Sequence, residues 1–346
     1  MRFRSVEAVL PSQIVTNEDI VRRVLHESEK HLSSAELATL SDTMFSTFKA
    51  AMTEVRYVRA KGERAADLAV QAGERALASA GLKPDQIDLL IYVGVGRGSL
   101  EPATANAFQD LLALTRATCF DLLDACASWL RGLELARVLT ESGRYSHIML
   151  LNAEFNVLEY AQHELRALED FEHLFPTYTI GEAATATIVS SGGDDQSFFD
   201  FRTYGDLRDL CFIPLPNRSE FSIADESGYA ENLRFYSRGR ALFLAVMKRG
   251  VRQVREMRER VPFAPEICFL HAASDGLGER FLSAVDVPLE RGVFTHRRFG
   301  NTVSASVPLG MAIAKEEGRL HPGMIASVFV GSAGVTTAVA QFRYLE

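Results

Sequence analysis

The chain has 346 residues, of which 47% are hydrophobic and 24% are charged, and its formal net charge at pH 7 is −8. A chain of this length can bury a large core, and the acidic balance argues against nucleic acid as its main partner. The N-terminal residues hold no apolar run of secretory-signal length, and no stretch approaches the length of a membrane span, so we expect a cytoplasmic protein with no membrane partner.

The four cysteines are spread widely and form no C-x-x-C pair. This spacing indicates neither a disulfide framework nor a zinc knuckle. We therefore expect free thiols and no metal site.

Helix and strand patterns alternate through the first half of the chain. Residues 63–80 carry an apolar helical stripe that Gly81 and Pro84 end, and 87–96 is a continuous apolar run of strand length. Helix-like and strand-like segments then follow in turn at 103–114, 117–123, 127–139 and 147–153. This order predicts an α/β fold with crossover connections and helices packed on a sheet.

The same order returns in the second half. The segment 240–261 reads as a helix, 266–271 as a strand, 301–317 as a helix and 324–330 as a buried strand. A shift of 175 residues carries Cys126 onto Asn301, and it also carries the helix at 63–80 onto 238–255. The spacing therefore predicts a duplicated unit whose equivalent strand-to-helix corners bring Cys126 and Asn301 close together.

Two stretches lack this regularity. Residues 27–60 and 155–237 are rich in charged, aromatic and proline residues and are long for loops of a compact fold. We expect them to form a cap that carries substrate specificity.

Cys126 lies in the sequence DLLDACASWLRG, after an expected strand and in the first turn of an expected helix. The positive end of a helix dipole and unpaired backbone amides lower the pKa of a thiol, so this position favours a nucleophile. The alternative is a small buried apolar residue, which is the interpretation we give to Cys119, Cys211 and Cys268.

His271 ends the strand-like EICFLH, where its side chain can project from a sheet edge into a cleft. It could donate a hydrogen bond to an acyl oxygen or accept a proton, although a lone histidine is commonly structural. Asn301 follows Gly300 at the start of a helix, where an asparagine ordinarily serves as an N-cap.

Three segments, DACAS, FLHAAS and FGNTVSASVPL, together resemble the active-site motifs of the β-ketoacyl-acyl-carrier-protein synthase III family in the thiolase superfamily. The third is the most specific, because the family motif Y-G-N-T-S-A-A-S-x-P differs from it at only a few places. LPSQIVTNEDI, PATANAFQDLLAL, GEAATATIV and GSAG are further segments that resemble this family, so the resemblance covers most of the chain.

The resemblance implies a five-layered α/β/α/β/α thiolase fold with two halves, 1–192 with the nucleophile and 193–346 with the histidine and asparagine. It also implies that Cys126 is acylated, that His271 and Asn301 stabilise a thioester-derived enolate, and that the backbone amides of Cys126 and Ala333 form an oxyanion hole. The expected substrates are acyl-coenzyme A or acyl-carrier-protein thioesters, with no permanently bound cofactor.

Three functions follow from these residues. The first is a Claisen condensation, in fatty-acid-related or specialised metabolism, between the acyl group on Cys126 and a second thioester. The second is transfer of that acyl group to an alcohol or amine. The third is a non-catalytic partner subunit, which the retained Cys126, His271 and Asn301 disfavour.

The chain departs from the family at several positions. A tryptophan that stacks on the adenine of coenzyme A in family members has no counterpart in TFKAAMTEVRYVR, and the one tryptophan of the chain is Trp129. We expect Glu101, Trp129, Phe243 and Ser332 to contact the substrate. Glu101 would do so across a dimer interface and would favour short or polar acyl groups, the alternative being a solvated loop carboxylate.

Basic residues of the segment 240–261 suit an acidic carrier protein, unless they form an ordinary solvated helix face; they are Lys248, Arg249, Arg252 and Arg255. The resemblance also implies a homodimer built on the strand at 117–123.

Overall fold

The computed structural model describes residues 1–155, 157–193, 197–216, 233–271 and 273–346, and its centre is two mixed five-stranded sheets. The first sheet has the order β1 (Arg2–Val9), β7 (Ala183–Ser190), β6 (His147–Glu154), β4 (Leu89–Val93) and β5 (Thr118–Leu122). The second has the order β8 (Phe198–Thr203), β14 (Thr336–Arg343), β13 (Ile325–Ser332), β11 (Ile267–Leu270) and β12 (Gly292–Val293). In both sheets the first three strands pair antiparallel and the last three pair parallel.

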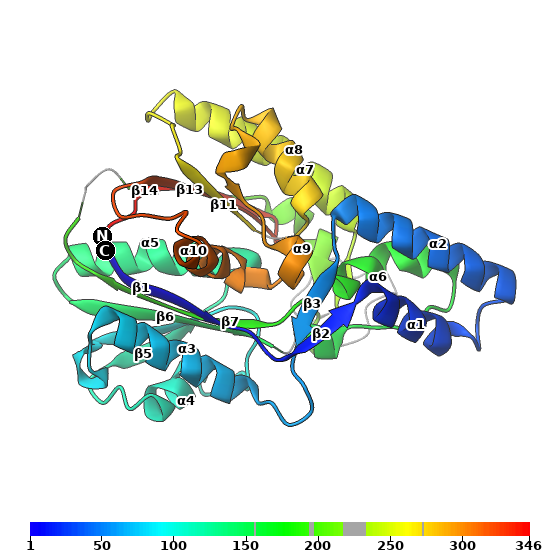
Figure 1. The fold of residues 1–346 in the computed structure, drawn as a ribbon, viewed down its shortest axis with the longest axis horizontal. Coiled ribbons are helices and arrows are strands. Elements are labelled where there is room, and N and C mark those ends of the chain that lie inside the picture. Colours follow the sequence, from blue (N-terminus) through cyan, green and yellow to red (C-terminus); the bar gives the residue numbers. More distant parts are fainter. Residues whose placement is uncertain (156, 194–196, 217–232, 272) are drawn as a thin grey trace.

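Helices cover both sheets and fill the space between them (Figure 1). The outer helices of the first sheet are α3 (Ala65–Ala80) and α4 (Thr104–Leu111), and those of the second are α7 (Gly239–Arg258) and α8 (Asp275–Ala284). The middle layer holds α5 (Ser128–Glu141) and α10 (Ser306–Glu316). The five-layered α/β/α/β/α prediction is therefore confirmed.

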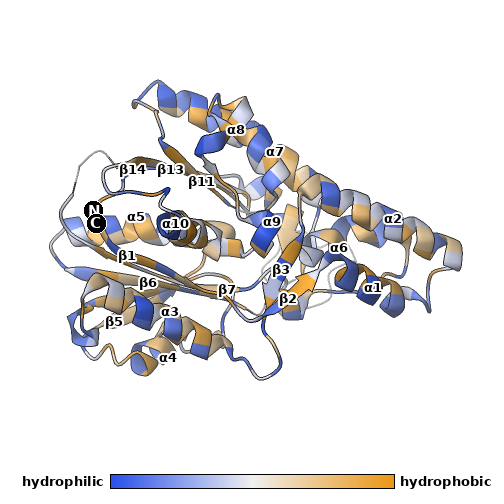
Figure 2. Cartoon of the chain, viewed as in Figure 1, coloured by the Kyte–Doolittle hydropathy of each residue, from blue (hydrophilic) through white to orange (hydrophobic). Residues whose placement is uncertain are grey.

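The middle layer is apolar because both sheets bury a face against it. All residues of β4 and β7 are buried, and the strands of both sheets are predominantly hydrophobic in Figure 2. Trp129 and Leu133 of α5, together with Met311 of α10, are at most 1% exposed within this layer.

The predicted 175-residue shift holds at these two helices. Carried forward by that shift, α5 falls on 303–316, where a 3-10 turn at Val303–Ala305 leads directly into α10. Cys126 and Asn301 therefore precede equivalent central helices. The two sheets have equivalent strand orders for the same reason.

A cap projects from one end of the layers (Figure 1). It contains β2 (Gln13–Thr16), α1 (Asn17–Ser28), α2 (Ser34–Ala51), β3 (Val55–Val58) and α6 (Phe171–Tyr178), and α1, α2 and α6 share an apolar core. The expectation that 27–60 is irregular was wrong, because α2 spans most of it. Ser33 and Glu36 form the capping box that starts this helix, a signal present in the sequence.

The stretch at 155–237 has short elements, although part of it lies outside the described residues. Besides α6 these are β9 (Cys211–Phe212) and β10 (Tyr236–Ser237), which pair antiparallel. Both β9 and α6 reach the cavity described below. The expected contribution of this segment to the substrate site is thus consistent with its position.

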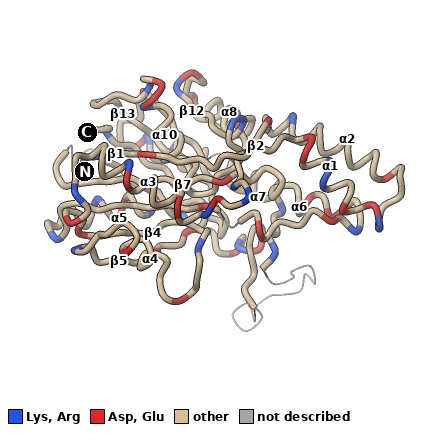
Figure 3. Tube along the Cα trace, turned by 60° about the horizontal axis from the view of Figure 1, so that its bottom comes forward, with Lys and Arg blue, Asp and Glu red and all other residues tan. Residues whose placement is uncertain are grey.

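Basic and acidic residues are intermixed along the described chain in Figure 3. Of the helices in the described part of the chain, none is both long enough and apolar enough to cross a membrane.

Candidate active site

A cavity of about 910 Å³ lies between the cap and the ends of the central helices, and it brings together three residues predicted from the sequence. Cys126, His271 and Asn301 all line it, although they are contributed by different elements. Within the described residues, no group of three or more histidine, cysteine or carboxylate side chains is placed to hold a metal ion. The site must therefore be understood through its thiol, imidazole and amide groups.

Cys126 lies in a 3-10 turn (Ala125–Ala127) that leads from β5 into α5. Burial raises the pKa of its thiol above the ordinary value, and the nearby Cys211 and Glu154 act in the same direction. Backbone amides of Ala333 and of Cys126 itself donate toward the sulfur and oppose this rise. The expectation of a lowered pKa was wrong, because the loss of hydration on burial outweighs the hydrogen bonds from these two amides.

The same two amides were predicted to form an oxyanion hole. Ala333 lines the cavity directly after β13, and its amide points toward Cys126. Ser332 fixes this approach: its hydroxyl donates to the carbonyl of Asp124 at 3.0 Å and accepts from the amide of Ala127 at 3.3 Å. The second sheet therefore holds the turn that carries the nucleophile.

His271 follows β11, and its amide donates to the carbonyl of Phe329 at 3.0 Å. Its Nδ1 lies 3.3 Å from the hydroxyl of Ser306 at the start of α10. Burial lowers the pKa of His271 to about 4, with His296 adding to the effect and a hydrogen bond with the backbone of Val303 opposing it. The imidazole is consequently neutral at physiological pH and can donate or accept a proton.

Asn301 is held by an isolated parallel β-bridge to Ile180. Its amide donates to the carbonyl of Thr179 at 2.7 Å, and its carbonyl accepts from the amide of Gly181 at 3.0 Å. A Cβ on Gly181 would lie 1.9 Å from the carbonyl oxygen of Phe299, at the end of α9 (His296–Phe299). Only glycine therefore permits the two backbone segments to approach this closely. The Asn301 Oδ1 accepts from the amide of Val303 at 2.9 Å, which leaves the side-chain NH₂ group as a donor for a ligand.

Glu154 was not identified from the sequence. It is buried at the end of β6, where it accepts hydrogen bonds from the amides of Val95 (3.1 Å) and Gly96 (2.8 Å) and from the hydroxyl of Ser304. Burial raises its pKa. A carboxylate that closes the apolar run HIMLLNA could have marked it, and its bonds join the Val95 loop to the turn after Asn301.

Cys211 was assigned to a purely structural role, yet it lines the cavity from β9 and influences the Cys126 thiol. Burial raises the pKa of Cys211 to about 11. Its position depends on the pairing of two very short strands, which the sequence pattern does not indicate.

Of the four residues expected to contact the substrate, one lines the cavity and three do not. Phe243 of α7 lines the cavity, whereas Ser332 is buried behind it. Trp129 does not reach the cavity, because it points into the middle layer and its indole N–H donates to the hydroxyl of Thr187 at 3.0 Å. Glu101 is exposed and does not line the cavity of its own chain, so only a second copy could bring it to this site.

The basic residues of α7 are partly engaged with neighbours. Arg249 lies over the ring of Tyr204 at 4.5 Å, and Arg252 pairs with Glu256 at 3.4 Å. Lys248 and Arg255 are exposed.

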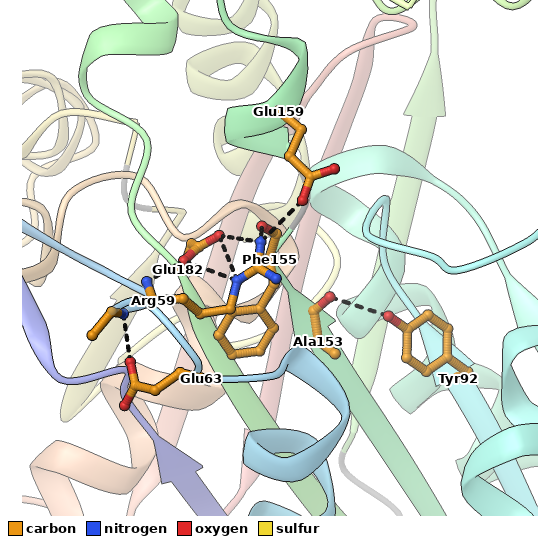
Figure 4. A network of polar contacts seen from close by, with 8 residues as sticks. Arg59, Glu63, Tyr92, Ala153, Phe155, Glu159 and Glu182 are labelled. Atoms are coloured by element: carbon orange, nitrogen blue, oxygen red, sulfur yellow. Dashed lines mark hydrogen bonds and ion pairs between the residues drawn. The ribbon is translucent and has the colours of Figure 1, made fainter.

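A polar network beside the site joins the cap to the first sheet (Figure 4). Arg59, just after β3, donates through its backbone amide to Glu182 at 2.6 Å and pairs with the same carboxylate through its guanidinium group at 3.2 Å. The guanidinium group also donates to the carbonyl of Phe155 at 2.7 Å and pairs with Glu159 at 3.2 Å. Because Glu182 directly follows Gly181, this network also supports the β-bridge that positions Asn301.

Comparison with known proteins agrees with this geometry. The family described as "3-Oxoacyl-[acyl-carrier-protein (ACP)] synthase III C terminal" matches residues 266–344. Two curated proteins named beta-ketoacyl-[acyl-carrier-protein] synthase III are similar over nearly their whole length. That of Granulibacter bethesdensis is 26% identical over 98% of this chain and 97% of its own, and that of Sulfurimonas denitrificans is 24% identical over 99% and 98%.

Solved structures share the fold. A 3-oxoacyl-[acyl-carrier-protein] synthase III from Aquifex aeolicus superposes with a TM-score of 0.80 at 21% identity, over 99% of both chains. A variant of OleA from Xanthomonas campestris gives a TM-score of 0.82 at 19% identity, over 99% of this chain and 98% of its own. The chain is thus similar over nearly its whole length to proteins named beta-ketoacyl-[acyl-carrier-protein] synthase III, and it shares their fold.

Proposed function

We propose that this protein is an acyltransferase that loads an acyl group on Cys126 and condenses it with a second thioester. The observation that carries the proposal is the convergence of Cys126, His271, Asn301 and Ala333 on one cavity. A thiol, two side-chain donors and a backbone amide are the groups that acyl transfer followed by carbon–carbon bond formation requires.

In the first step the Cys126 sulfur attacks the carbonyl carbon of the donor thioester. Because the His271 imidazole is neutral and the Cys126 thiol has a raised pKa, the proton leaves the sulfur as it attacks, with the imidazole as acceptor. The amides of Cys126 and Ala333 donate to the oxyanion. The carrier thiol then leaves with a proton, and the acyl group stays on Cys126.

In the second step His271 and Asn301 donate to the carbonyl oxygen of the incoming thioester and stabilise its enolate. Loss of carbon dioxide from an α-carboxylated thioester supplies the electron pair of this enolate. The α-carbon attacks the acyl carbonyl, and the Cys126 thiolate leaves. The donor role of Asn301 suits its side chain, since its Oδ1 already accepts from the amide of Val303 and its NH₂ group is left to donate.

Thioester delivery is supported by the relatives, whose names contain an acyl carrier protein, and by the OleA variant, which was solved with bound lauric acid and lauroyl-CoA. In this chain exposed Arg240 and Arg280 border the cavity and suit the phosphate of a phosphopantetheine group. Docking of an acidic carrier protein on Lys248, Arg249, Arg252 and Arg255 is part of the same proposal.

A second candidate is acyl transfer from Cys126 to an alcohol or amine, which the neutral His271 favours because it could accept the proton of the acceptor. Single-turnover measurements separate the two. Under condensation, Asn301→Ala should still acylate Cys126 but lose product formation by about 10²-fold or more, the effect of deleting one oxyanion donor.

Under simple transfer no enolate forms, so Asn301→Ala should change product formation only slightly, and His271→Ala should abolish it. Cys126→Ala should lose both steps in either case. Full turnover by Cys126→Ala would refute both candidates.

A further inference from the structure

The structure assigns Glu154 a positioning role in the condensation step: through Ser304 it holds the turn whose backbone amide orients the Asn301 side chain. The inference rests on the proposed function and adds to it a residue that no step of the reaction uses directly. Glu154 is 1% exposed and does not line the cavity. It therefore acts through Asn301 and not on the substrate.

The hydrogen bonds that the structure describes for the Glu154 carboxylate all come from donors. Its Oε1 accepts from the amide of Val95 at 3.1 Å and from the hydroxyl of Ser304, and its Oε2 accepts from the amide of Gly96 at 2.8 Å. The backbone amide of Ser304 also donates to the carboxylate. One side chain thus ties the loop after β4 to the turn after Asn301.

A neighbouring side chain fixes the direction of the hydrogen bond from Ser304. The NH₂ group of Asn152 donates to the carbonyl of Val93 at 2.9 Å and to the hydroxyl oxygen of Ser304 at 2.8 Å. The Ser304 oxygen therefore accepts from Asn152, and its hydrogen is directed to Glu154. A glutamine at position 154 would put an NH₂ group where an oxygen now accepts, so one backbone amide would lose its acceptor.

The backbone leaves room for this contact at one glycine. Gly94 has a φ of 140°, and a Cβ at this position would lie 2.6 Å from Oε1 of Glu154 and 3.1 Å from the hydroxyl oxygen of Ser304. Only glycine permits the carboxylate and the hydroxyl to meet here.

The turn that Glu154 holds has a strained backbone. Val303 has a φ of 50°, a left-handed conformation that is rare for a β-branched residue and costs free energy. In this conformation its amide donates to the Asn301 Oδ1 at 2.9 Å, which leaves the Asn301 NH₂ group to donate to a ligand. The hydrogen bonds between Ser304 and Glu154 hold the next residue and so oppose relaxation of the turn.

Both segments that Glu154 joins lie against the nucleophile. Val95, Val303 and Cys126 belong to one apolar cluster, and all three line the cavity. A shift of the Val303 turn would therefore move the Asn301 donor relative to the acyl group on Cys126. A misplacement of about 1 Å in an active site can lower a rate by about 10²-fold.

The test measures the two steps separately in Glu154→Gln. An acyl-coenzyme A donor loads Cys126, which is followed by intact mass, and malonyl-coenzyme A then serves as the α-carboxylated second thioester. We expect acylation within about threefold of the parent rate, because the amides that stabilise its oxyanion lie on the turn that Ser332 holds. Condensation should fall by about tenfold to 10²-fold.

A double-mutant cycle with Asn301→Ala decides whether Glu154 acts through that residue. Asn301→Ala alone should lower condensation by about 10²-fold. Adding Glu154→Gln should change this rate by less than about twofold, because the donor that Glu154 positions is already absent. Losses that multiply in the double variant, or parent-like condensation by Glu154→Gln, would overturn the proposal. Ser304→Ala takes the place of Glu154→Gln in the same cycle if that variant fails to fold.

Asp88→Ala is the matched control, because Asp88 also binds backbone amides beside β6 but at the opposite end of the strand. It accepts from the amides of Ser146 at 2.8 Å and His147 at 3.2 Å. Its loss should leave the ratio of the two rates within about twofold of the parent ratio, since distant sites act independently. A selective loss of condensation in Asp88→Ala would show that any weakening of β6 has this effect, and would overturn the assignment.

A crystal structure of Glu154→Gln separates this inference from the proposed reaction. An Asn301 side chain turned away from the Val303 amide would retain the positioning role even if the parent enzyme condensed no thioesters, which would refute the reaction alone. An Asn301 side chain in its parent position, together with unchanged condensation, would retain the reaction and refute the positioning role.

Discussion

The Cys126 thiol and the His271 imidazole are both held in their neutral forms by burial. A thiol whose pKa is raised has little thiolate at neutral pH, so its reactivity comes from proton transfer during attack rather than from a standing charge. The pair is therefore suited to a donor that is already bound beside His271. A free electrophile gains no such assistance.

We predict that iodoacetamide, which needs the thiolate, alkylates Cys126 slowly at pH 7 and about tenfold faster for each pH unit up to about pH 9. Peptide mass spectrometry would follow Cys126 separately from Cys119, Cys211 and Cys268, with Cys126→Ala as the blank. A rate that levels off below about pH 8 would show that the thiol pKa is not raised.

The identity of the chemical groups could be predicted from the sequence, but their protonation could not. The order and spacing of Cys126, His271 and Asn301 are properties of the chain. The pKa of Cys126 depends on Cys211 and Glu154, which lie far from it in sequence and reach it only through β9 and β6. Burial of this kind arises from packing, and local helix position gave the wrong sign.

At the scale of elements, the alternation of 3.6-residue and continuous apolar patterns predicted an α/β fold, and the 175-residue shift predicted the equivalence of α5 and α10. The five layers were implied by the family resemblance. The apolar pattern did not predict the helix α2 of the cap. Helix α2 has an apolar stripe interrupted by polar residues, and its buried positions, Leu40, Met44 and Phe48, pack on α1 and α6 rather than on a sheet. Its start at Ser33 was nevertheless readable from the capping box.

The strands β2 and β3 join the cap to the first sheet through Arg59 and Glu182. The Glu182 side chain is 3% exposed and that of Arg59 is 25% exposed, so this pair is shielded from water (Figure 4). Burial raises the pKa of Glu182, and the hydrogen bonds and charge of Arg59 oppose that rise. Removing the Glu182 carboxylate would therefore deprive the Arg59 guanidinium group of its main partner.

We predict that Glu182→Ala lowers the free energy of unfolding by about 3 kcal/mol, as measured by urea denaturation. Glu159→Ala is the matched control, because Glu159 pairs with the same arginine but its side chain is 64% exposed. Its effect should stay below about 1 kcal/mol. Equal losses in both variants would show that shielding of the pair from water has no influence on its contribution.

At the scale of the whole molecule, the described part of the first sheet ends in an edge strand, β5. Within the described residues, strand β5 has β4 on one side and no strand on the other, and edge strands expose unpaired backbone groups. Apolar side chains gather in and around this strand: Leu100 is 72% exposed, Leu111 52%, Phe120 36% and Leu123 60%. Such a surface is characteristic of an interface.

We predict a homodimer in which β5 pairs with β5 of a second copy and the two first sheets become continuous. The same association would cover Leu123, which also lines the cavity, and would bring Glu101 of each chain near the site of the other. The proposed division into halves 1–192 and 193–346 is compatible with this arrangement, because all strands of the first sheet precede residue 192.

Sedimentation velocity at micromolar concentration should show a dimer for the parent protein. Phe120→Lys should shift it to monomer, since two lysines facing one another across a twofold axis repel and lose the apolar contact. Leu289→Lys, at a residue that is 42% exposed beside the second sheet, is the control and should remain dimeric. A monomeric parent protein would contradict the prediction and would show that the apolar residues around β5 do not form a dimer interface. A dimeric Phe120→Lys would move the interface away from β5, and Glu101 would then have no route to the cavity.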